Sequence, residues 1–317
     1  MFVVGGESLI DLVSQPLGID GVIHMDAHAG GSPYNCAIAL SRLGNSTGFL
    51  CPISTDGLGD YLMKPLTDAG VMPLLEERVS APTSLAVVTL NEKREARYQF
   101  YRSADRAFTE GKLLAALPQK PLFYQIGGFC AILEDDAQVW ASVAGAAAER
   151  GAVISIDPNV RPTLVDDFEA YKRRLEVFFA LAHIIKVSRE DLESLDPGMG
   201  VEAHAADLLL KPNCELVVVT LGDEGSRAFT RSGEARAGIF SPPVFGDTVG
   251  AGDSLMAGIA SRIAERGDLE PGRMGQLDDA ALRDVLEFGA IVAGLNCAHM
   301  GCHPPSRAEV EAVLSTR

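Results

Sequence analysis

Short apolar runs alternate with longer amphipathic stretches along most of the chain. The short runs have the length and bulk of strands that are buried on both faces of a parallel sheet. We expect strands at residues 2–5, 47–53, 122–126, 153–156, 183–187 and 216–220. Apolar residues at helical spacing predict helices at residues 35–43, 59–69, 136–150, 168–181, 253–266, 279–299 and 306–314. This alternation favours an α/β fold in which helices cover both faces of the sheet.

One region departs from the alternation. Residues 83–90 and 96–102 both have strand character and flank the polar segment NEKRE, which predicts an antiparallel hairpin. The stretch of about residues 12–30 shows no helical period. We therefore expect it to form a small β lid together with about residues 82–105, outside the main sheet. No repeat or Pro/Gly-rich linker divides the chain, so we expect a single domain over residues 1–317 that carries this lid.

The overall charge limits the classes of partner. The 317-residue chain is 47% hydrophobic and 22% charged, as in an ordinary soluble globular protein. Its net charge is −16 and its pI is near 4.8. We expect no nucleic-acid partner, because phosphate backbones bind basic surfaces. A phosphate ester would have to be bound by local groups, such as helix N-termini, backbone N–H groups and a metal ion.

The N-terminal segment and the cysteines bear on the cellular compartment. The opening residues, MFVVGGESLIDLV, have neither the positive segment nor the long apolar run of a signal peptide. No uncharged apolar stretch reaches the roughly 18 residues of a membrane span, so we expect no membrane partner. The six cysteines form no C-x-x-C pair and are expected to be buried, reduced thiols. These features predict a cytoplasmic protein.

The strongest chemical signal is the segment DTVGAGDSLMAG at residues 247–258. Gly250, Ala251 and Gly252 precede a helical pattern, so backbone N–H groups and the positive end of the helix dipole can form an anion site there. Asp253 opens the helix beside this site, where a carboxylate can accept the proton of an attacking hydroxyl during phosphoryl transfer. The alternative is that Asp253 only caps a helix after a tight glycine turn.

A second signal is the segment AGGSPYNCAIALSRLG at residues 29–44. Gly30 and Gly31 permit a close approach of the backbone to a ligand or to another segment. Asn35 offers an amide that can bind the oxygens of a polyol. The alternative is that this segment is an ordinary junction between a loop and a helix, with Asn35 as the cap.

Three further polar residues are candidates for binding a sugar. Asp11 is expected just past a strand, where its carboxylate can accept hydrogen bonds from two neighbouring hydroxyls, or where it is simply a solvated turn residue. Arg102 ends the second hairpin strand and Arg161 follows the segment DPNV. Either guanidinium could bind a hydroxyl, a carboxylate or a phosphate, or remain on the surface. Asp105 is either a partner of Arg102 or solvated.

Two common nucleotide-binding motifs are absent from the sequence. It contains no G-x-x-x-x-G-K-[ST] segment, so we do not expect a P-loop enzyme. It also has no G-x-G-x-x-G after the first strand, where it reads FVVGGES, and this disfavours a dinucleotide-dependent dehydrogenase.

The two signals together resemble the two signature segments of the PfkB, or ribokinase-like, family of carbohydrate kinases. GGSPYNCAIALSRLG and DTVGAGDSLMAG occur in the family's order and at a plausible separation. Other matching stretches are GESLID, IDPNVRP, VVVTLGDEGS and CAHMGCHPPSRAEV, so the resemblance covers nearly the whole chain. It implies a doubly wound α/β core with a mostly parallel sheet and a β-sheet lid over the sugar. It also implies ATP and Mg²⁺ as cofactors.

The resemblance also implies roles for individual residues. Asp253 matches the catalytic base. The family's anion hole for the γ-phosphoryl group is matched here by Gly250, Ala251 and Gly252. The expected sugar contacts are Asp11, Gly30, Gly31, Asn35, Arg102 and Arg161. The expected nucleotide-binding residues are Ser188, Thr220, Gly222, Gly225 and Asn296. Asp247 matches a contributor to a monovalent-cation site, which makes dependence on K⁺ an open expectation.

The chain departs from the family pattern in the segment KVSREDLESL at residues 186–195. Many relatives have N-x-x-E there, in which the Glu helps to hold Mg²⁺ through water. Ser188 stands in the place of the Asn, as in the fructokinase-like branch, and Asp191 stands in the place of the Glu. Asp191 is one methylene shorter, which puts its indirect role at Mg²⁺ in question. The two residues also fit a capping box of a helix.

The sugar is not specified by these motifs. GESLID, GGSPYN and FYRSAD look most like bacterial fructokinases, which favours fructose or a similar ketose. Arg102 and Arg161 keep open a 2-keto-3-deoxygluconate kinase, since these arginines could bind the carboxylate of a sugar acid. A nucleoside or another polyol is a further option, and a non-catalytic sugar-binding protein on the same fold is the alternative of a different class. The exposed edges of a lid hairpin also suggest a homodimer.

Overall fold

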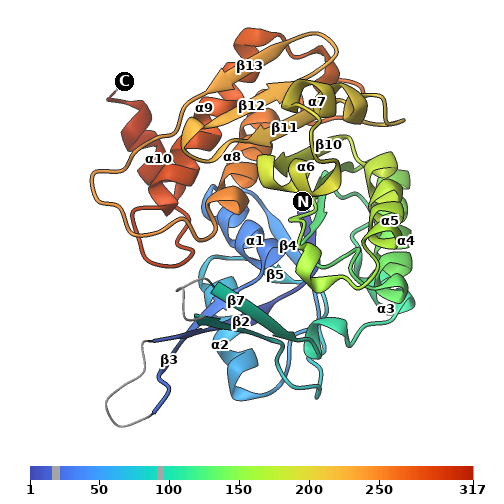
Figure 1. The fold of residues 1–317 in the computed structure, drawn as a ribbon, viewed down its shortest axis with the longest axis vertical. Helices are drawn as coiled ribbons and strands as arrows, with labels where there is room; N and C mark the ends of the chain where they lie inside the picture. The colour runs from blue at the N-terminus through green and yellow to red at the C-terminus, as the bar shows by residue number, and fades with distance from the viewer. Residues whose placement is uncertain (16–21, 91–95, 317) are drawn as a thin grey trace.

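The computed structural model describes residues 1–15, 22–90 and 96–316, and within them the strands form two separate sheets (Figure 1). The main sheet has nine strands in the order β13-β12-β11-β10-β9-β8-β1-β4-β5. Their bounds are β1 Phe2–Gly5, β4 Thr47–Leu50, β5 Met72–Pro73, β8 Phe123–Gly127, β9 Val153–Asp157, β10 Ile184–Ser188, β11 Leu216–Thr220, β12 Ser226–Phe229 and β13 Glu234–Ala237. The expected strands at residues 2–5, 47–53, 122–126, 153–156, 183–187 and 216–220 each correspond to a strand of this sheet, although β4 ends at Leu50 and not at residue 53.

The direction of the strands follows from their connections. From β5 across to β11 every neighbouring pair is parallel, because these strands are joined through helices that return the chain to the same edge. The pairs β11–β12 and β12–β13 are antiparallel, since short turns join these strands. The last two strands were not expected from the apolar pattern, because each is short and carries charged residues.

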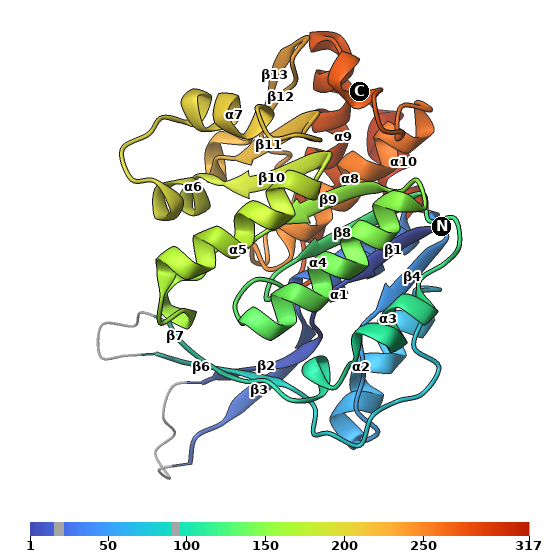
Figure 2. The same cartoon turned by 90° about the vertical axis from the view of Figure 1, so that its right-hand side faces the viewer.

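Helices cover both faces of the main sheet (Figure 2). One buried cluster contains residues of α1, α8 and α9, and the other contains residues of α4 and α5. The bounds are α1 Ser32–Arg42, α2 Gly57–Asp68, α3 Glu110–Ala116, α4 Glu134–Glu149, α5 Phe168–Leu181, α6 Arg189–Leu195, α7 Val201–Leu209, α8 Ala251–Glu265, α9 Asp279–Asn296 and α10 Arg307–Leu314. This is the doubly wound, mostly parallel arrangement that the sequence predicted.

The second sheet lies to one side of the α/β core (Figure 2). Its strands are β2 Leu9–Ser14, β3 Met25–Gly30, β6 Leu85–Leu90 and β7 Ala96–Tyr101, in the order β3-β2-β6-β7. We call these four strands the lid. The pairs at its edges are antiparallel and the central pair, β2 with β6, is parallel. The segment NEKRE and residues 16–21 of the expected lid lie outside the described residues.

Two of the expected element boundaries are wrong near the candidate site. Asp11 lies inside β2 and not past the end of a strand, because the chain pairs with β3 and β6 from Leu9 onward. Helix α1 begins at Ser32, three residues before the expected start, with Gly31 as its N-cap. The reason is Pro33, which is tolerated in the first turn of a helix because the N–H it lacks would have no partner there. Asn35 is therefore inside the helix and is not its cap.

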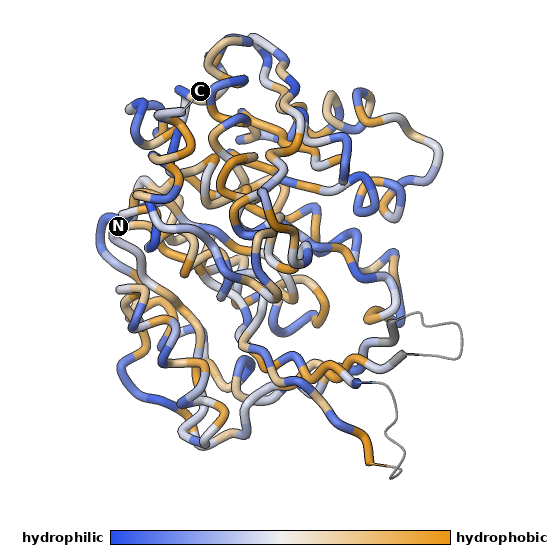
Figure 3. The backbone as a smooth tube through the Cα atoms, turned by 90° about the vertical axis from the view of Figure 1, so that its left-hand side faces the viewer, coloured by the Kyte–Doolittle hydropathy of each residue, from blue (hydrophilic) through white to orange (hydrophobic). Residues whose placement is uncertain are grey.

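The distribution of hydropathy is that of a chain with a buried core. In Figure 3 hydrophobic and hydrophilic residues are interspersed along the outer segments of the backbone. Within the described residues, no helix combines the length and the apolar character needed to cross a membrane. All six cysteines are free thiols, and five of them are buried.

Candidate active site

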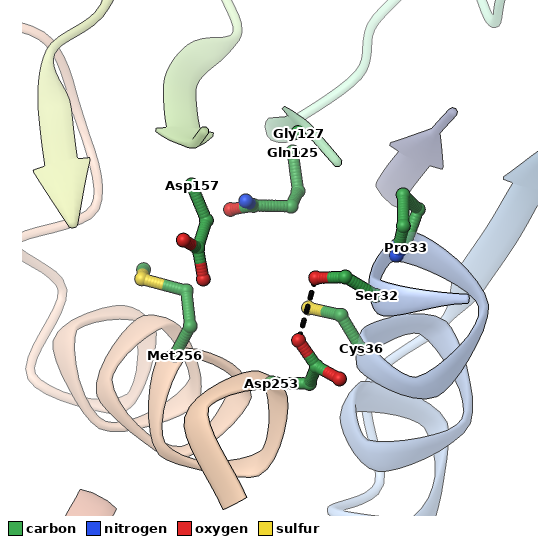
Figure 4. Close-up of a pocket in the computed structure, with 8 residues that line it drawn as sticks. All are labelled: Ser32, Pro33, Cys36, Gln125, Gly127, Asp157, Asp253 and Met256. Atoms are coloured by element: carbon green, nitrogen blue, oxygen red, sulfur yellow. Dashed lines mark hydrogen bonds between the residues drawn. The ribbon is translucent and has the colours of Figure 1, made fainter. Parts of the chain in front are cut away.

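The N-termini of α1 and α8 converge beside the carboxyl ends of the central parallel strands (Figure 4). A pocket lies between them and is lined by Ser32, Pro33, Cys36, Gln125, Gly127, Asp157, Asp253 and Met256. Gly127 ends β8 and Asp157 ends β9, so strands that are neighbours in the sheet deliver both residues to one edge. Ligands of open α/β sheets bind at this edge.

Asp253 is fixed in place by two side chains of α1. Ser32 donates a hydrogen bond from Oγ to Oδ1 of Asp253 at 2.6 Å, and Asn35 donates from Nδ2 to Oδ2 at 2.9 Å. The N-cap of α8 is Gly250, and no side chain caps this helix end. The interpretation of Asp253 as a helix cap is therefore wrong. Its carboxylate is directed from the first turn of α8 toward α1 (Figure 4).

The environment of Asp253 raises its pKa to about 6. Burial is the largest cause, because a low-dielectric surrounding disfavours the charged carboxylate, and the neighbouring Asp157 acts in the same direction. The hydrogen bonds from Ser32 and Asn35 and the ammonium of Lys186 lower the pKa in part. A carboxylate with this pKa is ionised at neutral pH and is a better proton acceptor than an ordinary Asp.

The glycine turn before α8 offers backbone N–H groups. Gly250 has a left-handed backbone with φ +73°, and a Cβ at this position would overlap the Sγ of Cys302. The first helical hydrogen bond runs from the N–H of Ser254 to the carbonyl of Gly250. The N–H groups of Gly252 and Asp253 precede this bond, so they are available to an anion at the positive end of a long helix. The turn therefore fits a phosphoryl group.

A buried ion pair lies behind the turn. Nζ of Lys186, on β10, is 2.7 Å from Oδ2 of Asp157 at the end of β9. Burial raises the pKa of the Asp157 carboxyl. Burial lowers the pKa of Lys186, but the carboxylates of Asp157, Asp191 and Asp253 together hold it above its ordinary value. A separation of 2.7 Å is that of a charge-assisted hydrogen bond.

Two buried acceptors in the pocket lack a partner. Oδ1 of Asp157 and Oε1 of Gln125 have no hydrogen-bond partner among the described residues. Buried acceptors of this kind are rare unless a ligand, water or ion completes them. The pocket therefore favours a molecule that donates hydrogen bonds, such as a hydroxyl.

The lid brings two of the expected sugar contacts, Asp11 and Gly30, together, and Gly31 follows them at the start of α1. Asp11 on β2 lies so close to Gly30 at the end of β3 that a Cβ at Gly30 would overlap its Oδ2. Gly31 has φ +112°, and a Cβ there would lie 2.9 Å from the carbonyl oxygen of Glu7. Burial raises the pKa of Asp11 to about 6, with His28 opposing this shift. Gly31 is thus required by its left-handed backbone and by the backbone of Glu7 and Ser8, while Gly30 leaves room for the carboxylate of Asp11.

The two arginines lie in different environments. Arg102 is largely buried, and its guanidinium forms ion pairs with Asp105 at 2.7 Å and Asp136 at 3.2 Å. It also stacks over the ring of Phe129 at 4.9 Å. Asp105 is therefore a partner of Arg102 and is not solvated. Arg161 is exposed at the start of a short 3₁₀ turn, so of the two arginines only Arg161 has an exposed side chain.

The expected nucleotide-binding residues lie at the ends of β10 and β11. Ser188 and Thr220 are paired across these strands, so their positions are side by side at the same edge as Asp157. Gly222 and Gly225 flank the next turn with φ +63° and +89°. A Cβ on Gly225 would overlap the carbonyl oxygen of Ala237 on β13, so this turn requires a glycine.

Asn296 and Asp247 hold loops in place. Asn296 is fully buried at the end of α9, and it donates to the carbonyl of Val249 at 2.7 Å and accepts from the N–H of His303 at 2.8 Å. Asp247 accepts from the N–H groups of Val249 at 2.9 Å and Gly301 at 2.8 Å. Both residues therefore join the glycine-turn loop to the segment around residues 301–303, and their contacts with nucleotide or K⁺ stay predictions.

Comparison with known proteins identifies the family. Residues 1–309 match the pfkB family of carbohydrate kinases. The chain belongs to this family. It is 31% identical to fructokinase-2 of Solanum lycopersicum, over 98% of the chain and 94% of that protein. It is 32% identical to a probable fructokinase-4 of Arabidopsis thaliana, over 98% of the chain and 95% of that protein.

Solved structures agree with this assignment. A fructokinase with bound ATP from Xylella fastidiosa has a TM-score of 0.87 at 27% identity, and the match covers 99% of this chain and 98% of the other. Ribokinase from Giardia lamblia has a TM-score of 0.81 at 22% identity, with coverage of 99% and 98%, and this likeness shows the fold. The expected ribokinase-like fold is confirmed.

The chain differs from the common pfkB pattern at Ser188 and Asp191, as the sequence predicted. Ser188 and Asp191 form a capping box at the start of α6. Oδ2 of Asp191 accepts from the N–H of Ser188 at 2.7 Å, and Oδ1 accepts from the N–H of Val160 at 2.7 Å. Both carboxylate oxygens are thus engaged by the backbone. The described residues contain no cluster of three or more His, Cys, Asp or Glu that could hold a metal. An indirect role of Asp191 at Mg²⁺ stays a prediction.

Three residues of this carbohydrate kinase's site were not singled out from the sequence. Ser32 was passed over because the helix was expected to begin later, although Pro33 after it is a signal of a helix start. Lys186 lies inside a strand expected to be apolar, and Asp157 lies one residue past the expected end of another. A charged residue within such a strand is itself a signal, since it must find a partner of opposite charge.

Proposed function

We propose that this pfkB carbohydrate kinase transfers the γ-phosphoryl group of MgATP to a hydroxyl of fructose or a similar ketose. The observation that carries the proposal is the carboxylate of Asp253, held by Ser32 and Asn35 beside the glycine turn of α8. A base and an anion site are thereby adjacent, which is the arrangement that phosphoryl transfer to a hydroxyl needs. A protein that only binds sugar would not require it.

The reaction assigns a step to each part of the site. Asp253 accepts the proton of the attacking hydroxyl. The N–H groups that follow Gly250 bind the oxygens of the transferring phosphoryl group and stabilise the charge that develops on them. Mg²⁺ bound to the substrate ATP would neutralise part of the negative charge of the phosphates. The nucleotide lies along the edge formed by Ser188, Thr220, Gly222 and Gly225, and the lid covers the sugar and excludes water.

A neutral sugar is favoured over a sugar acid. Arg102, one of the two arginines considered for a carboxylate, is already neutralised by Asp105 and Asp136. Two of the expected sugar contacts, Asp11 and Asn35, carry a carboxylate and an amide, which suit hydroxyl groups. A double mutant of the fructokinase from Vibrio cholerae O395, whose structure contains fructose, ADP and potassium, shares the fold with a TM-score of 0.80 at 23% identity. These points support a ketose and keep K⁺ dependence as a proposal.

Two broader properties are proposed on chemical grounds. We place the enzyme in the cytoplasm, because its reaction needs ATP and all six cysteines are free thiols. We also propose a homodimer that forms through the lid, whose edge strands have no partner strand within the described residues.

The test is a coupled ADP assay with fructose, tagatose, ribose, 2-keto-3-deoxygluconate and adenosine, with Mg²⁺ and with or without K⁺. We expect turnover on fructose and none on the keto acid. Turnover on the keto acid alone would overturn the ketose assignment. Failure to turn over any of these sugars, together with failure to bind ATP, would contradict a kinase of this kind.

The variant Asp253→Asn removes the base while keeping the shape of the side chain. We expect kcat to fall by roughly 10²–10⁴-fold, because general-base catalysis is worth that much. ATP binding, measured by calorimetry, should change little. The matched control is Asp60→Asn on the exposed face of α2, which should retain full activity. Near-normal turnover of Asp253→Asn would contradict the assigned base.

A further inference from the structure

We infer that Lys186 is a further catalytic residue, whose ammonium contacts the transferring phosphoryl group at the glycine turn. The inference rests on the proposed kinase reaction. It gives this chain a fixed protein cation at the phosphoryl group, in addition to the backbone N–H groups of the turn. The residue lies in a strand, where neither of the two signature segments includes it.

The position of Nζ carries the inference. A Cβ built on Gly252 would lie 3.0 Å from Nζ of Lys186, with the Lys186 side chain as its closest contact. The ammonium therefore packs directly against the second residue of α8, whose N–H group has no partner within the helix. A side chain at position 252 would press on the ammonium, so Gly252 leaves it room to lie against the turn. A phosphoryl oxygen bound by the turn is thereby within reach of Nζ.

The ammonium also has unused hydrogen-bonding capacity. It carries three N–H donors, and within the described residues its hydrogen bond is to Oδ2 of Asp157. The side chain is only 8% exposed, so the remaining donors are not freely hydrated. Buried donors of this kind need acceptors, and oxygens of a phosphoryl group at the turn would supply them.

The alternative is that Lys186 only neutralises Asp157. A buried ion pair adds little stability compared with an apolar pair of similar volume, so stability is a weak reason to keep it. The charges nearby add a stronger reason. The carboxylates of Asp157, Asp191 and Asp253 are all close enough to Lys186 to act on its charge, and they would repel an incoming phosphate if no cation stood among them.

The chemistry balances without a proton from Lys186. The sugar oxygen attacks the γ-phosphorus, and its O–H proton goes to the carboxylate of Asp253. The bond from the γ-phosphorus to the bridging oxygen breaks, and its electron pair stays on the β-phosphate of ADP. Lys186 keeps all its protons and forms no covalent bond, and it stabilises the negative charge on the phosphoryl oxygens throughout the transfer.

The test separates removal of the cation from disruption of the pair. Lys186→Met alone would leave Asp157 buried without a partner, so it would risk failing to fold. We therefore compare Asp157→Asn, which keeps the ammonium, with the double variant Asp157→Asn and Lys186→Met, which removes both charges. Lys64→Met, an exposed lysine of α2, is the surface control. Thermal melting shows whether each variant is folded.

We expect the double variant to have a kcat roughly 10²–10³-fold below that of Asp157→Asn, since a single donor to a developing oxyanion is worth that much. KM for the sugar should stay within about threefold. The acid limb of the pH profile should stay near its wild-type position, because the opposing effects of Asp157 and Lys186 on Asp253 are removed together. The single variant Lys186→Arg, which keeps a cation, should have a kcat between that of the double variant and that of the wild type.

Equal kcat values for the two variants, both folded, would overturn the catalytic role of Lys186. A loss of rate that appears only as a displaced acid limb would also overturn it, because Lys186 would then act through the pKa of Asp253. The wild-type enzyme is assayed in parallel with the same sugar. If the wild type shows no turnover on any sugar, the kinase proposal has failed, which is a different result from an inactive double variant beside an active wild type.

Discussion

At the scale of single residues, Asp253 is controlled by neighbours that oppose one another. Burial and Asp157 favour its protonated form, while the hydrogen bonds from Ser32 and Asn35 and the charge of Lys186 favour its ionised form. The resulting pKa of about 6 leaves the base ionised at neutral pH. The pKa of Asp253 therefore depends on side chains of α1, β9 and β10 as well as on its own position in α8.

This balance predicts the pH dependence of the reaction. Because Asp253 must be ionised to accept a proton, kcat should fall about tenfold per pH unit as the pH drops below about 6. Ser32→Ala removes a hydrogen bond to the ionised form, so it should move this acid limb upward by roughly one pH unit. Measuring kcat from pH 5 to pH 8 for both proteins tests the prediction. A limb that does not move would show that Ser32 has no influence on the base.

At the scale of secondary-structure elements, the buried ion-pair network of Arg102 joins the lid to the core. Arg102 follows β7, Asp105 lies in the turn after it, and Asp136 is in the first turn of α4. Ser84 adds a hydrogen bond to Asp105. The network fixes the place where the lid strands leave the α/β core, which is a structural role for an arginine that the sequence had suggested as a sugar contact.

Removing the cation of this network should destabilise the protein. Arg102→Leu leaves Asp105 buried without a cation, while Asp136 keeps its ion pair with Arg106, so we expect a loss of about 3 kcal/mol in the free energy of unfolding. Urea denaturation measures this change. Arg161→Leu, at an exposed position, should leave stability nearly unchanged and serves as the comparison. If Arg102→Leu keeps its stability and only raises KM for the sugar, the guanidinium binds substrate instead.

The elements also show what could be predicted from the sequence. The parallel strands and long helices were predictable because their apolar periodicity follows directly from burial on a sheet. Strands β12 and β13 were not, since four-residue strands with charged residues carry no clear pattern. Asp253 and its glycine turn were predictable from local chemistry. The pair of Asp157 and Lys186 was not, because it forms between strands whose neighbours in space are unknown until the sheet order is known.

At the scale of the whole molecule, the exposed side of the lid suggests how two copies associate. β3 and β7 are the edge strands of the lid, and Ile23 beside β3 and Tyr98 and Tyr101 on β7 are 61%, 57% and 58% exposed. Figure 3 shows hydrophobic colour where the chain leads into β3. Large apolar residues at an unpaired sheet edge favour pairing with another chain.

The expected assembly is a dimer that depends on this edge. Wild-type protein should elute with the mass of two chains in size-exclusion chromatography with light scattering. Tyr98→Glu places a charge at the edge of β7 and should shift the equilibrium to the monomer. Leu210→Glu introduces the same charge at an exposed site after α7, away from the lid, and should leave the mass unchanged. A wild-type monomer at high protein concentration would refute the dimer.

The short connection between the lid and α1 bears on the hydrolysis of ATP when no sugar is bound. β3 ends at Gly30 and α1 begins at Ser32, so a single residue separates the strand that we propose covers the sugar from the helix that holds Asp253. Any tilt of β3 is therefore passed on to Ser32 and Asn35. When no sugar holds the lid in position, the base is less well oriented, and a water molecule is a poorer substitute for the sugar hydroxyl. We therefore expect the same short connection that positions the base also to limit hydrolysis of ATP by water when no sugar is bound.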